Sequence, residues 1–311
     1  MRPRDAARGR ALRNALETYA REVRALPGII PPRSLDSLVE QIVDSLRRIE
    51  YVRFIHARGH DPARQDPSSS LFDPLIAASL AQHSGDIDEG CWLVFLSVHF
   101  GKHRIAEWSL TREIYGALRA ARPWNWVNVS NDSAGFERWL QANESNLRNA
   151  GVVHFGNHRK YESLRVGPSG TASIVRSYIA WVTRHGNHSG LFQAAAAAST
   201  GDVGRAFDFL YNSMASVIRF GRMARFDYVA MLGKLELAQV EPAIAYLNGA
   251  TGPLKGARLL FGGSPNADLS CHTLDPLVAE LGARLGVGMQ AMEDALCNWQ
   301  KSPERYARFA G

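Results

Sequence analysis

The sequence predicts an all-α protein. Its apolar residues recur three or four positions apart over long stretches, which is the spacing of one face of a helix. In residues 5–26 the apolar side chains share one side and arginines occupy the others. The apolar positions there are Leu12, Leu16, Ala20 and Val23. No alternating pattern of convincing length indicates a strand, so we expect a chain built almost wholly from helices.

Prolines divide the N-terminal part of the chain. Three prolines in residues 27–32 end the first helix. Ser34 or Asp36 can then cap a second helix that runs to about Phe54. The polar stretch 56–70 contains two Asp-Pro pairs and predicts a long loop.

Shorter helices follow this loop. They are predicted at residues 71–82, 91–100, 136–149 and 174–185, and five alanines at 194–198 favour helix and close packing. We expect two regions: an N-terminal helical layer and loop in residues 1–70, and a larger helical, catalytic region in residues 71–311.

The composition bounds the class of protein. The 311 residues can hold one large domain or two lobes, and 46% of them are hydrophobic, enough for a sizeable core. The chain has 36 Lys and Arg residues and 30 Asp and Glu residues. The resulting net charge of +6 favours a polyanionic partner in a general way. We expect a monomer.

The three cysteines exclude two kinds of metal centre. Cys91, Cys271 and Cys297 are far apart and form no Cys-x-x-Cys pair, so neither a thiolate zinc site nor a four-cysteine iron–sulfur cluster is available. We expect no metal and no cofactor. The N-terminus lacks the apolar core of a secretion signal, and no run of about eighteen apolar residues occurs. These features predict a cytoplasmic protein without a membrane partner.

A six-residue pattern occurs twice. His99-Phe-Gly-Lys-His-Arg104 recurs as His154-Phe-Gly-Asn-His-Arg159. Each copy has histidines four apart, which could bind a metal on a helix, but the neighbouring cations would repel a metal ion and no carboxylate lies beside them. Two interpretations stay open: recognition of an anion or a base, or surface cations at helix ends. The first predicts a base pocket formed by His99, His103, Arg104, His154, Asn157, His158, Arg159, Lys160 and Tyr161.

A basic stripe is predicted further along the chain. Arg219, Arg222 and Arg225 recur every three residues and would share one face of a helix. They could contact phosphates, or Asp227 could neutralise part of them in a buried ion-pair network. Both interpretations stay open.

Residues 238–262 predict two helices that meet at a glycine turn. An apolar helix ends near Leu247, and the chain turns at Gly249 and Gly252 into a second helix. Such a turn points backbone N–H groups and a helix N-terminus outward, which suits a phosphate. Downstream, Asp275 is expected to cap another helix, with a proline at its first position.

These segments resemble the helix-hairpin-helix DNA glycosylases, in which a Leu-x-Gly-x-Gly-type hairpin grips the DNA backbone and a loop leads to a catalytic aspartate. The matching residues are Leu247, Gly249, Gly252, Ala257, Leu274, Asp275, Arg284, Leu285 and Gly286. The hairpin is slightly longer than the usual pattern, and Leu277 stands where many members carry a histidine. The resemblance implies a glycosylase-like helical fold with extra N-terminal helices, and Asp275 as the catalytic residue.

Lys255 lies where glycosylases with lyase activity often place a Schiff-base lysine. It is also placed to bind a phosphate as a cation of the hairpin, and we favour that role.

Most of the chain also resembles the alpha-glutamyl/putrescinyl thymine pyrophosphorylase family. The similarity lies in the repeat, in residues 219–228 and in residues 293–301. That family is associated with thymine hypermodification in phages, where an amine displaces pyrophosphate from an activated 5-hydroxymethyl group in DNA. Both resemblances imply an enzyme that reaches a pyrimidine held out of the duplex.

Two reactions on modified pyrimidines therefore stay open. We expect a DNA glycosylase without lyase activity that cleaves the N-glycosidic bond of a hydroxymethylated, glucosylated or otherwise hypermodified pyrimidine, with Asp275 stabilising the sugar cation. Its partner would be phage DNA, as in host defence. The alternative is a transferase in which Arg104, Arg159 and Lys160 stabilise the leaving pyrophosphate. In that case Glu162 or Asp227 would bind the amine.

Overall fold

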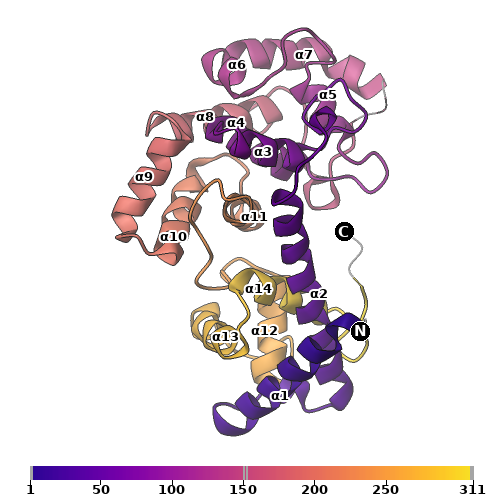
Figure 1. Cartoon of the computed structure of the whole chain (residues 1–311), viewed down its shortest axis with the longest axis vertical. Coiled ribbons are helices and arrows are strands. Elements are labelled where there is room, and N and C mark those ends of the chain that lie inside the picture. The colour runs from indigo at the N-terminus through magenta and orange to yellow at the C-terminus, as the bar shows by residue number, and fades with distance from the viewer. Residues whose placement is uncertain (1–2, 150, 152, 309–311) are drawn as a thin grey trace. The chain divides into compact units, whose positions relative to one another are not determined.

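The computed structural model describes residues 3–149, 151 and 153–308, and all regular structure in this part of the chain is helical (Figure 1). Its one β-type pairing within these residues is an isolated bridge between His103 and Glu107. The predicted all-α class is confirmed. The α-helices are α1 (Ala6–Glu22), α2 (Pro32–His56), α3 (Pro74–His83), α4 (Ile87–Phe100), α5 (Ser109–Tyr115), α6 (Trp126–Asn131), α7 (Ser133–Asn149), α8 (Thr171–Thr183), α9 (His188–Ser199), α10 (Val203–Ser213), α11 (Arg222–Lys234), α12 (Gly252–Gly262), α13 (Cys271–Leu285) and α14 (Met289–Trp299).

Helix starts follow the capping residues in the sequence. The side chains of Asp73, Asp86, Asn187 and Asp202 accept hydrogen bonds from backbone N–H groups in the first turns of α3, α4, α9 and α10. The long loop predicted after α2 is present, interrupted by the 3-10 turn η3 (Pro62–Arg64).

The described residues form two compact units. Among these residues, unit 1 combines 3–52 with 242–308, and unit 2 lies within 53–241. This division differs from the boundary expected at residue 70. Sequence spacing shows which face of a helix is apolar but not which helix it packs against, and the first two helices share a core with the last three.

Unit 1 is built around one core shared by α1, α2, α12, α13 and α14. Leu16 of α1 and Trp299 of α14 are fully buried in it, and the Trp299 indole N–H donates to the Ser34 carbonyl oxygen at 3.1 Å. α12 crosses α14 closely because Gly256 has no side chain: a Cβ there would overlap the carbonyl oxygen of Leu296. The first two and the last three α-helices thus share one core.

Only the second helix of the expected hairpin forms. The residues between α11 and α12 contain turns and bends but no helix, and α12 starts at Gly252. Pro242 lacks an N–H donor and disfavours helix in the residue before it. Tyr246 and Gly249 have φ angles of 51° and 73°, outside the right-handed helical region. The helix predicted to end near Leu247 is therefore absent, and the prediction of two helices is wrong.

Asp275 does not cap α13. The Ser270 hydroxyl accepts a hydrogen bond from the Thr273 N–H at 3.1 Å, and the helix starts at Cys271. Asp275 and Pro276 therefore lie inside the helix. The prediction of the cap is wrong because Ser270 offers a cap earlier in the chain, and Pro276 then removes one intrahelical hydrogen bond without ending the helix.

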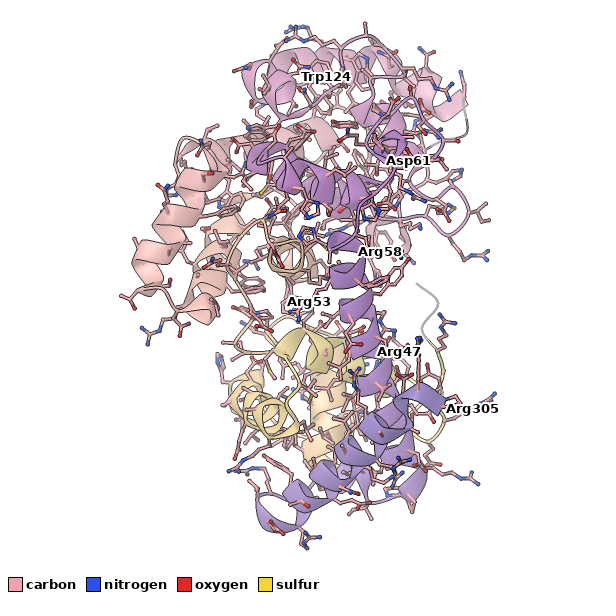
Figure 2. The ribbon with its side chains drawn as sticks, viewed as in Figure 1. Arg47, Arg53, Arg58, Asp61, Trp124 and Arg305 are labelled. Carbon is pink, nitrogen blue, oxygen red and sulfur yellow. The ribbon has the colours of Figure 1, made fainter. Side chains whose placement is uncertain are left out.

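Unit 2 is organised around α4. Residues 91–96 are all buried, as expected of a helix that others cover on several sides. α3, α9 and α11 pack against α4, and α9 and α10 run side by side (Figure 1). Trp124, labelled in Figure 2, precedes α6. Its ring packs edge-on against that of Phe136, with centroids 5.4 Å apart. The C-terminal end of α4 carries His99 and Phe100, where the first copy of the repeat begins.

Glu89 ties the start of α4 to two other helices. Its carboxylate accepts hydrogen bonds from the Tyr115 hydroxyl and the Trp126 backbone N–H, both at 2.7 Å. Burial raises the pKa of Glu89 from 4.5 to about 7, because desolvation of the carboxylate outweighs these two hydrogen bonds. Between these pH values the folded protein keeps a proton that the unfolded chain has lost.

The contribution of Glu89 to the free energy of unfolding should therefore decrease as pH rises from 4.5 to about 7. Glu89→Gln cannot titrate, so its melting temperature should fall less than that of the wild type over this range. The difference should be a few degrees, measured by thermal melts in matched buffers. If the melting temperatures of the two proteins change with pH in the same way, another group is responsible for the pH dependence.

Candidate functional site

The two copies of the repeat lie against each other in unit 2. The Gly156 N–H donates to the Phe100 carbonyl oxygen at 2.7 Å, and a Cβ on Gly156 would lie 2.8 Å from the carbonyl carbon of Gly101. The rings of His103 and His154 stack with centroids 4.8 Å apart. A side chain at either glycine would push the segments apart. We call this structure the paired loops, defined as residues 101–107 and the described residues of 153–162.

The pairing gives equivalent histidines different surroundings. His99 is 1% exposed, shares a hydrogen bond of 3.1 Å with the Thr171 hydroxyl and stacks on Phe95. Burial lowers the pKa of His99 to about 3, so its ring is neutral. His99 is therefore a core residue, and the prediction that it lines an open base pocket is wrong. Its counterpart His154 is exposed.

The second copy of the repeat lines a cavity of about 270 Å³. His154 and Lys160, both expected in the base pocket, line it together with Arg148 and Glu162. The structure thus brings two of the expected residues together on one cavity. Three others are exposed to solvent: Arg104, His158 and Tyr161. The side chain of Asn157 lies outside the described part of the chain.

Arg159 is half-buried and fixed by two contacts. Its Nε donates to the Val98 carbonyl oxygen at 2.9 Å, and its guanidinium carbon lies 5.4 Å from the centroid of the Phe220 ring. Burial lowers the pKa of Arg159, whereas Asp227 and Glu162 raise it. A guanidinium keeps its charge at neutral pH, so Arg159 presents a positioned cation.

The predicted arginine stripe does not form. α11 starts at Arg222, and Arg219 precedes it with a φ angle of 58°, so the three arginines do not share one helical face. Arg219 instead pairs with Glu162 at 2.8 Å. Arg225 lies 4.4 Å from the centroid of the Tyr211 ring and donates to the carbonyl oxygen of the same residue. The left-handed backbone at Arg219 breaks the periodicity that the sequence suggested.

Four basic side chains act electrostatically on the carboxylate of Asp227 in α11. In order of their effect on its carboxylate, these are Arg159, Lys234, Arg222 and His158. Solvent reaches Asp227, but enough protein surrounds it to restrict its hydration. This desolvation raises the pKa of Asp227 and outweighs the four cationic groups, which lower it.

These five groups come from two short segments of unit 2. The 3-10 turn η4 (Asn157–Arg159) supplies His158 and Arg159, and α11 supplies the other three. The excess of positive charge suits an anion with several oxygen atoms, since Arg and Lys donate strong hydrogen bonds to such groups. A carboxylate with a raised pKa can also accept a proton. We refer to these five residues as the cation ring.

The turn before α12 anchors Asp275 within unit 1. The Leu247 N–H lies 3.2 Å from each carboxylate oxygen of Asp275, whose side chain is half-buried. Gly252 is explained by packing, because a Cβ there would lie 2.6 Å from the sulfur of Cys297. Lys255 is exposed in the first turns of α12. The hairpin residues and the paired loops therefore belong to different units.

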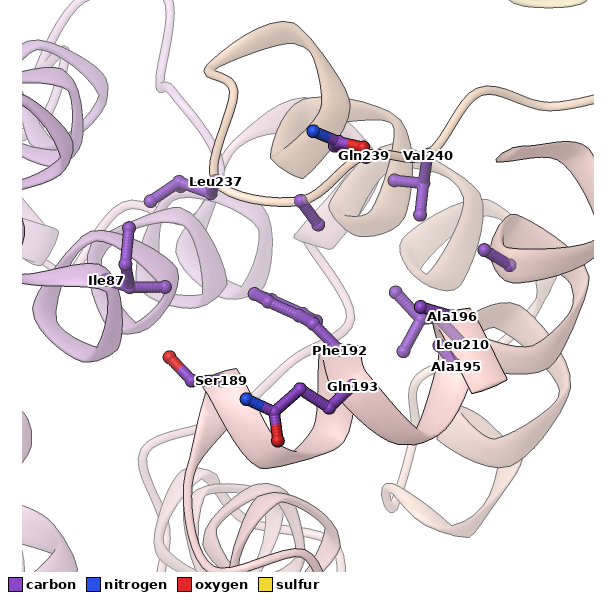
Figure 3. A pocket seen from close by; sticks show the side chains of 12 residues that line it. Ile87, Ser189, Phe192, Gln193, Ala195, Ala196, Leu210, Leu237, Gln239 and Val240 are labelled. Carbon is purple, nitrogen blue, oxygen red and sulfur yellow. The ribbon is translucent and has the colours of Figure 1, made fainter. Parts of the chain in front are cut away.

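A second cavity in unit 2, of about 330 Å³, is apolar (Figure 3). Phe192 points into it, with Leu237 on one side and Val240 on another (Figure 3). Ala195 and Ala196, from the alanine run that predicted only close packing, also line it. None of its lining residues is titratable, so this cavity supplies no acid or base.

Within the described residues, no group of three or more His, Cys, Asp or Glu side chains is arranged to hold a metal ion. The helices of the same part of the chain include none that is long and apolar enough to span a membrane.

The comparisons with known proteins assign the family. A family model described as alpha-glutamyl/putrescinyl thymine pyrophosphorylase clade 3 matches residues 33–311. The chain belongs to this family. No curated protein and no solved structure matches it. The whole-chain resemblance predicted from the repeat and the two later segments is confirmed, whereas the helix-hairpin-helix superfamily is not confirmed.

The name of this family indicates enzymes that act on modified thymine. The matched residues include both the cation ring of unit 2 and Asp275 of unit 1.

Gly156→Ala should destabilise the protein, because the new Cβ would lie 2.8 Å from Gly101 and 3.0 Å from the Lys102 backbone nitrogen. Overpacking of this kind costs about 1–3 kcal/mol, measurable by chemical denaturation. Gly59→Ala is the matched control, since nothing lies within 4 Å of its Cβ position. Equal stability of both variants would contradict the close pairing of the loops.

Proposed function

We propose that the chain replaces pyrophosphate with an amine on an activated 5-hydroxymethyluracil base in DNA. The observation that carries this proposal is the cation ring, in which Arg159, Lys234, Arg222 and His158 act electrostatically on the carboxylate of Asp227. The family supports the substrate class, because it is named for pyrophosphorylases of glutamyl- and putrescinyl-thymine.

The leaving group in this reaction needs concentrated positive charge. The bond between the 5-methylene carbon and the pyrophosphate oxygen breaks, and its electron pair stays with the oxygen. Arg159 and Arg222 can stabilise this charge through paired hydrogen bonds, and Lys234 adds a third cation. Arg159 is already fixed by the Val98 carbonyl and the Phe220 ring, so little rearrangement is needed when charge develops.

Asp227 can serve the incoming amine. The new bond forms from the nitrogen lone pair to the 5-methylene carbon, and the nitrogen must then lose one proton. A carboxylate whose pKa is raised is a better base than an ordinary aspartate, so Asp227 can accept this proton. Its negative charge also attracts a protonated amine into a site that otherwise favours anions.

The paired loops give DNA a basic face beside the cation ring. Arg104 and Lys160 are exposed, and Lys160 with His154 lines the 270 Å³ cavity. We assign this cavity to part of a base extruded from the duplex, which an enzyme must reach before it can act on the 5-position. The turn at Gly249 and the exposed Lys255 provide a further phosphate contact in unit 1.

A second candidate function, cleavage of the N-glycosidic bond, is favoured by Asp275. The Leu247 backbone nitrogen lies 3.2 Å from each of its two carboxylate oxygens and donates to them. An ionised carboxylate can stabilise the sugar cation that forms when the base leaves. Such an activity on phage-type bases would damage phage DNA and would fit host defence.

One experiment separates the two functions. DNA carrying pyrophosphorylated 5-hydroxymethyluracil would be incubated with the protein and with glutamate or putrescine, and the nucleosides, free bases and phosphate products identified by mass spectrometry. Wild type, Asp227→Asn and Asp275→Asn would be compared. The proposal predicts an amine-modified nucleoside and free pyrophosphate, both lost in Asp227→Asn.

The glycosylase would be the correct function if the products are free base and an abasic site. Both products should then be lost in Asp275→Asn and kept in Asp227→Asn. Unchanged DNA with every amine and no released base would contradict both functions.

Asp227→Asn should lower the rate by about 10²–10⁴-fold, the usual effect of losing a general base. It should not lower stability. Folding raises the pKa of Asp227, so the stability that its protonated form contributes is lost as pH rises through the folded pKa. At neutral pH or above, the melting temperature of Asp227→Asn should therefore equal or exceed that of the wild type. Asp268→Asn, an exposed aspartate of unit 1, is the control and should change neither quantity.

A further inference from the structure

The paired loops expose large apolar side chains at their tips. Ile105 is 75% exposed and Tyr161 is 77% exposed, whereas most large apolar residues of unit 2 are buried. The Ile105 position is not a disordered tip: the His103 ring nitrogen Nδ1 accepts a hydrogen bond from the Ala106 N–H at 3.0 Å and closes the turn. The backbone beside Ile105 is therefore fixed by a hydrogen bond, while both side chains are exposed to solvent.

Contacts between the loops place the two tips on one surface. The first loop meets the second where His103 stacks on His154 at 4.8 Å. His154 and Lys160 line the same cavity, and the Lys160 ammonium lies 5.1 Å from the centroid of the Tyr161 ring. Ile105 lies two residues from His103, and Tyr161 follows Lys160 directly, so both adjoin this series of contacts; we call Arg104, Ile105, Lys160 and Tyr161 the strip.

The charges on this strip are not neutralised. Within the described residues, neither Arg104 nor Lys160 lies within 4 Å of a carboxylate, whereas Lys102 pairs with Glu107 at 3.2 Å. Arg104 and Lys160 are thus next to the exposed residues Ile105 and Tyr161 in the sequence. They suit a partner that presents phosphates and flat apolar rings together.

We propose that this strip binds unpaired or locally opened DNA. Tyr161 stacks on a base of the opened strand, Ile105 enters the space beside it, and Arg104 and Lys160 hold the flanking phosphates. This inference rests on the proposed function for the identity of DNA as the partner. It adds that the protein recognises DNA that is already open, through two side chains outside the base cavity.

A purely protein partner fits the strip less well. An apolar docking surface for a protein has its charged residues at the rim, whereas here Lys160 lies over the Tyr161 ring itself. A cation beside an aromatic face suits a nucleic-acid strand, in which bases and phosphates alternate.

The test measures binding of unmodified DNA, so it does not depend on catalysis. Fluorescence anisotropy would compare a perfect duplex with the same duplex carrying a bulged 2-aminopurine. The proteins would be wild type, Tyr161→Ala, Tyr161→Phe, Ile105→Ala and Val127→Ala. Val127 is the matched control, because it is 60% exposed on α6 of the same unit, outside the paired loops.

Wild type should bind the bulged duplex more tightly than the perfect one and quench the 2-aminopurine fluorescence. Tyr161→Ala should weaken binding to the bulged DNA about tenfold and abolish the quenching, the size expected for loss of one stacked base. Tyr161→Phe and Val127→Ala should behave as wild type, and Ile105→Ala should reduce the preference for the bulge.

Two results would overturn this inference, and a third would also contradict the proposed function. If wild type shows no preference for the bulge, or if Tyr161→Ala quenches and binds as wild type does, the strip is not a surface for opened DNA. If wild type binds neither DNA, the proposed function fails with it.

Discussion

The backbone contact between Gly101 and Gly156 is the constraint on which the candidate site depends. It joins two segments that are far apart in the chain and sets η4 against the end of α4. From there Arg159 reaches the Val98 carbonyl and the Phe220 ring, and its charge acts on Asp227 of α11. Without the two glycines the loops could not approach, and the cations of η4 would not be positioned.

Electrostatics gives this arrangement its chemical character. A half-buried arginine and a poorly hydrated aspartate are each unfavourable alone, because each charge has lost water. Together they partly compensate: Asp227 raises the pKa of Arg159, and Arg159 lowers that of Asp227. Desolvation still prevails at both residues, so the pair retains unsatisfied charge. A ligand that carries both an anion and an amine would relieve it, which is the combination of groups that the proposed reaction requires.

Sequence patterns predicted the helices well, because they depend on local spacing and capping. They failed where tertiary contacts decide. His99 and His154 occupy the same position of one motif, yet one is core and the other exposed, since only the pairing of the loops distinguishes them. Asp227 was predicted either as an ion-pair partner of the arginines or as a ligand of the amine, but its interaction with the basic groups of η4 was not predicted, because η4 is remote in sequence. The cap predicted at Asp275 was displaced by Ser270, a competition between two adequate signals that local rules do not rank.

Binding of inorganic pyrophosphate tests the central claim most directly, because it needs neither modified DNA nor turnover. Isothermal titration calorimetry would compare wild type with Arg159→Gln and Asp227→Asn at neutral pH. The cation ring predicts that wild type binds pyrophosphate, that Arg159→Gln binds it more weakly, and that Asp227→Asn binds it more tightly because a repelling carboxylate is gone. A wild type that does not bind, or two variants that shift the affinity in the same direction, would contradict the assignment of this site.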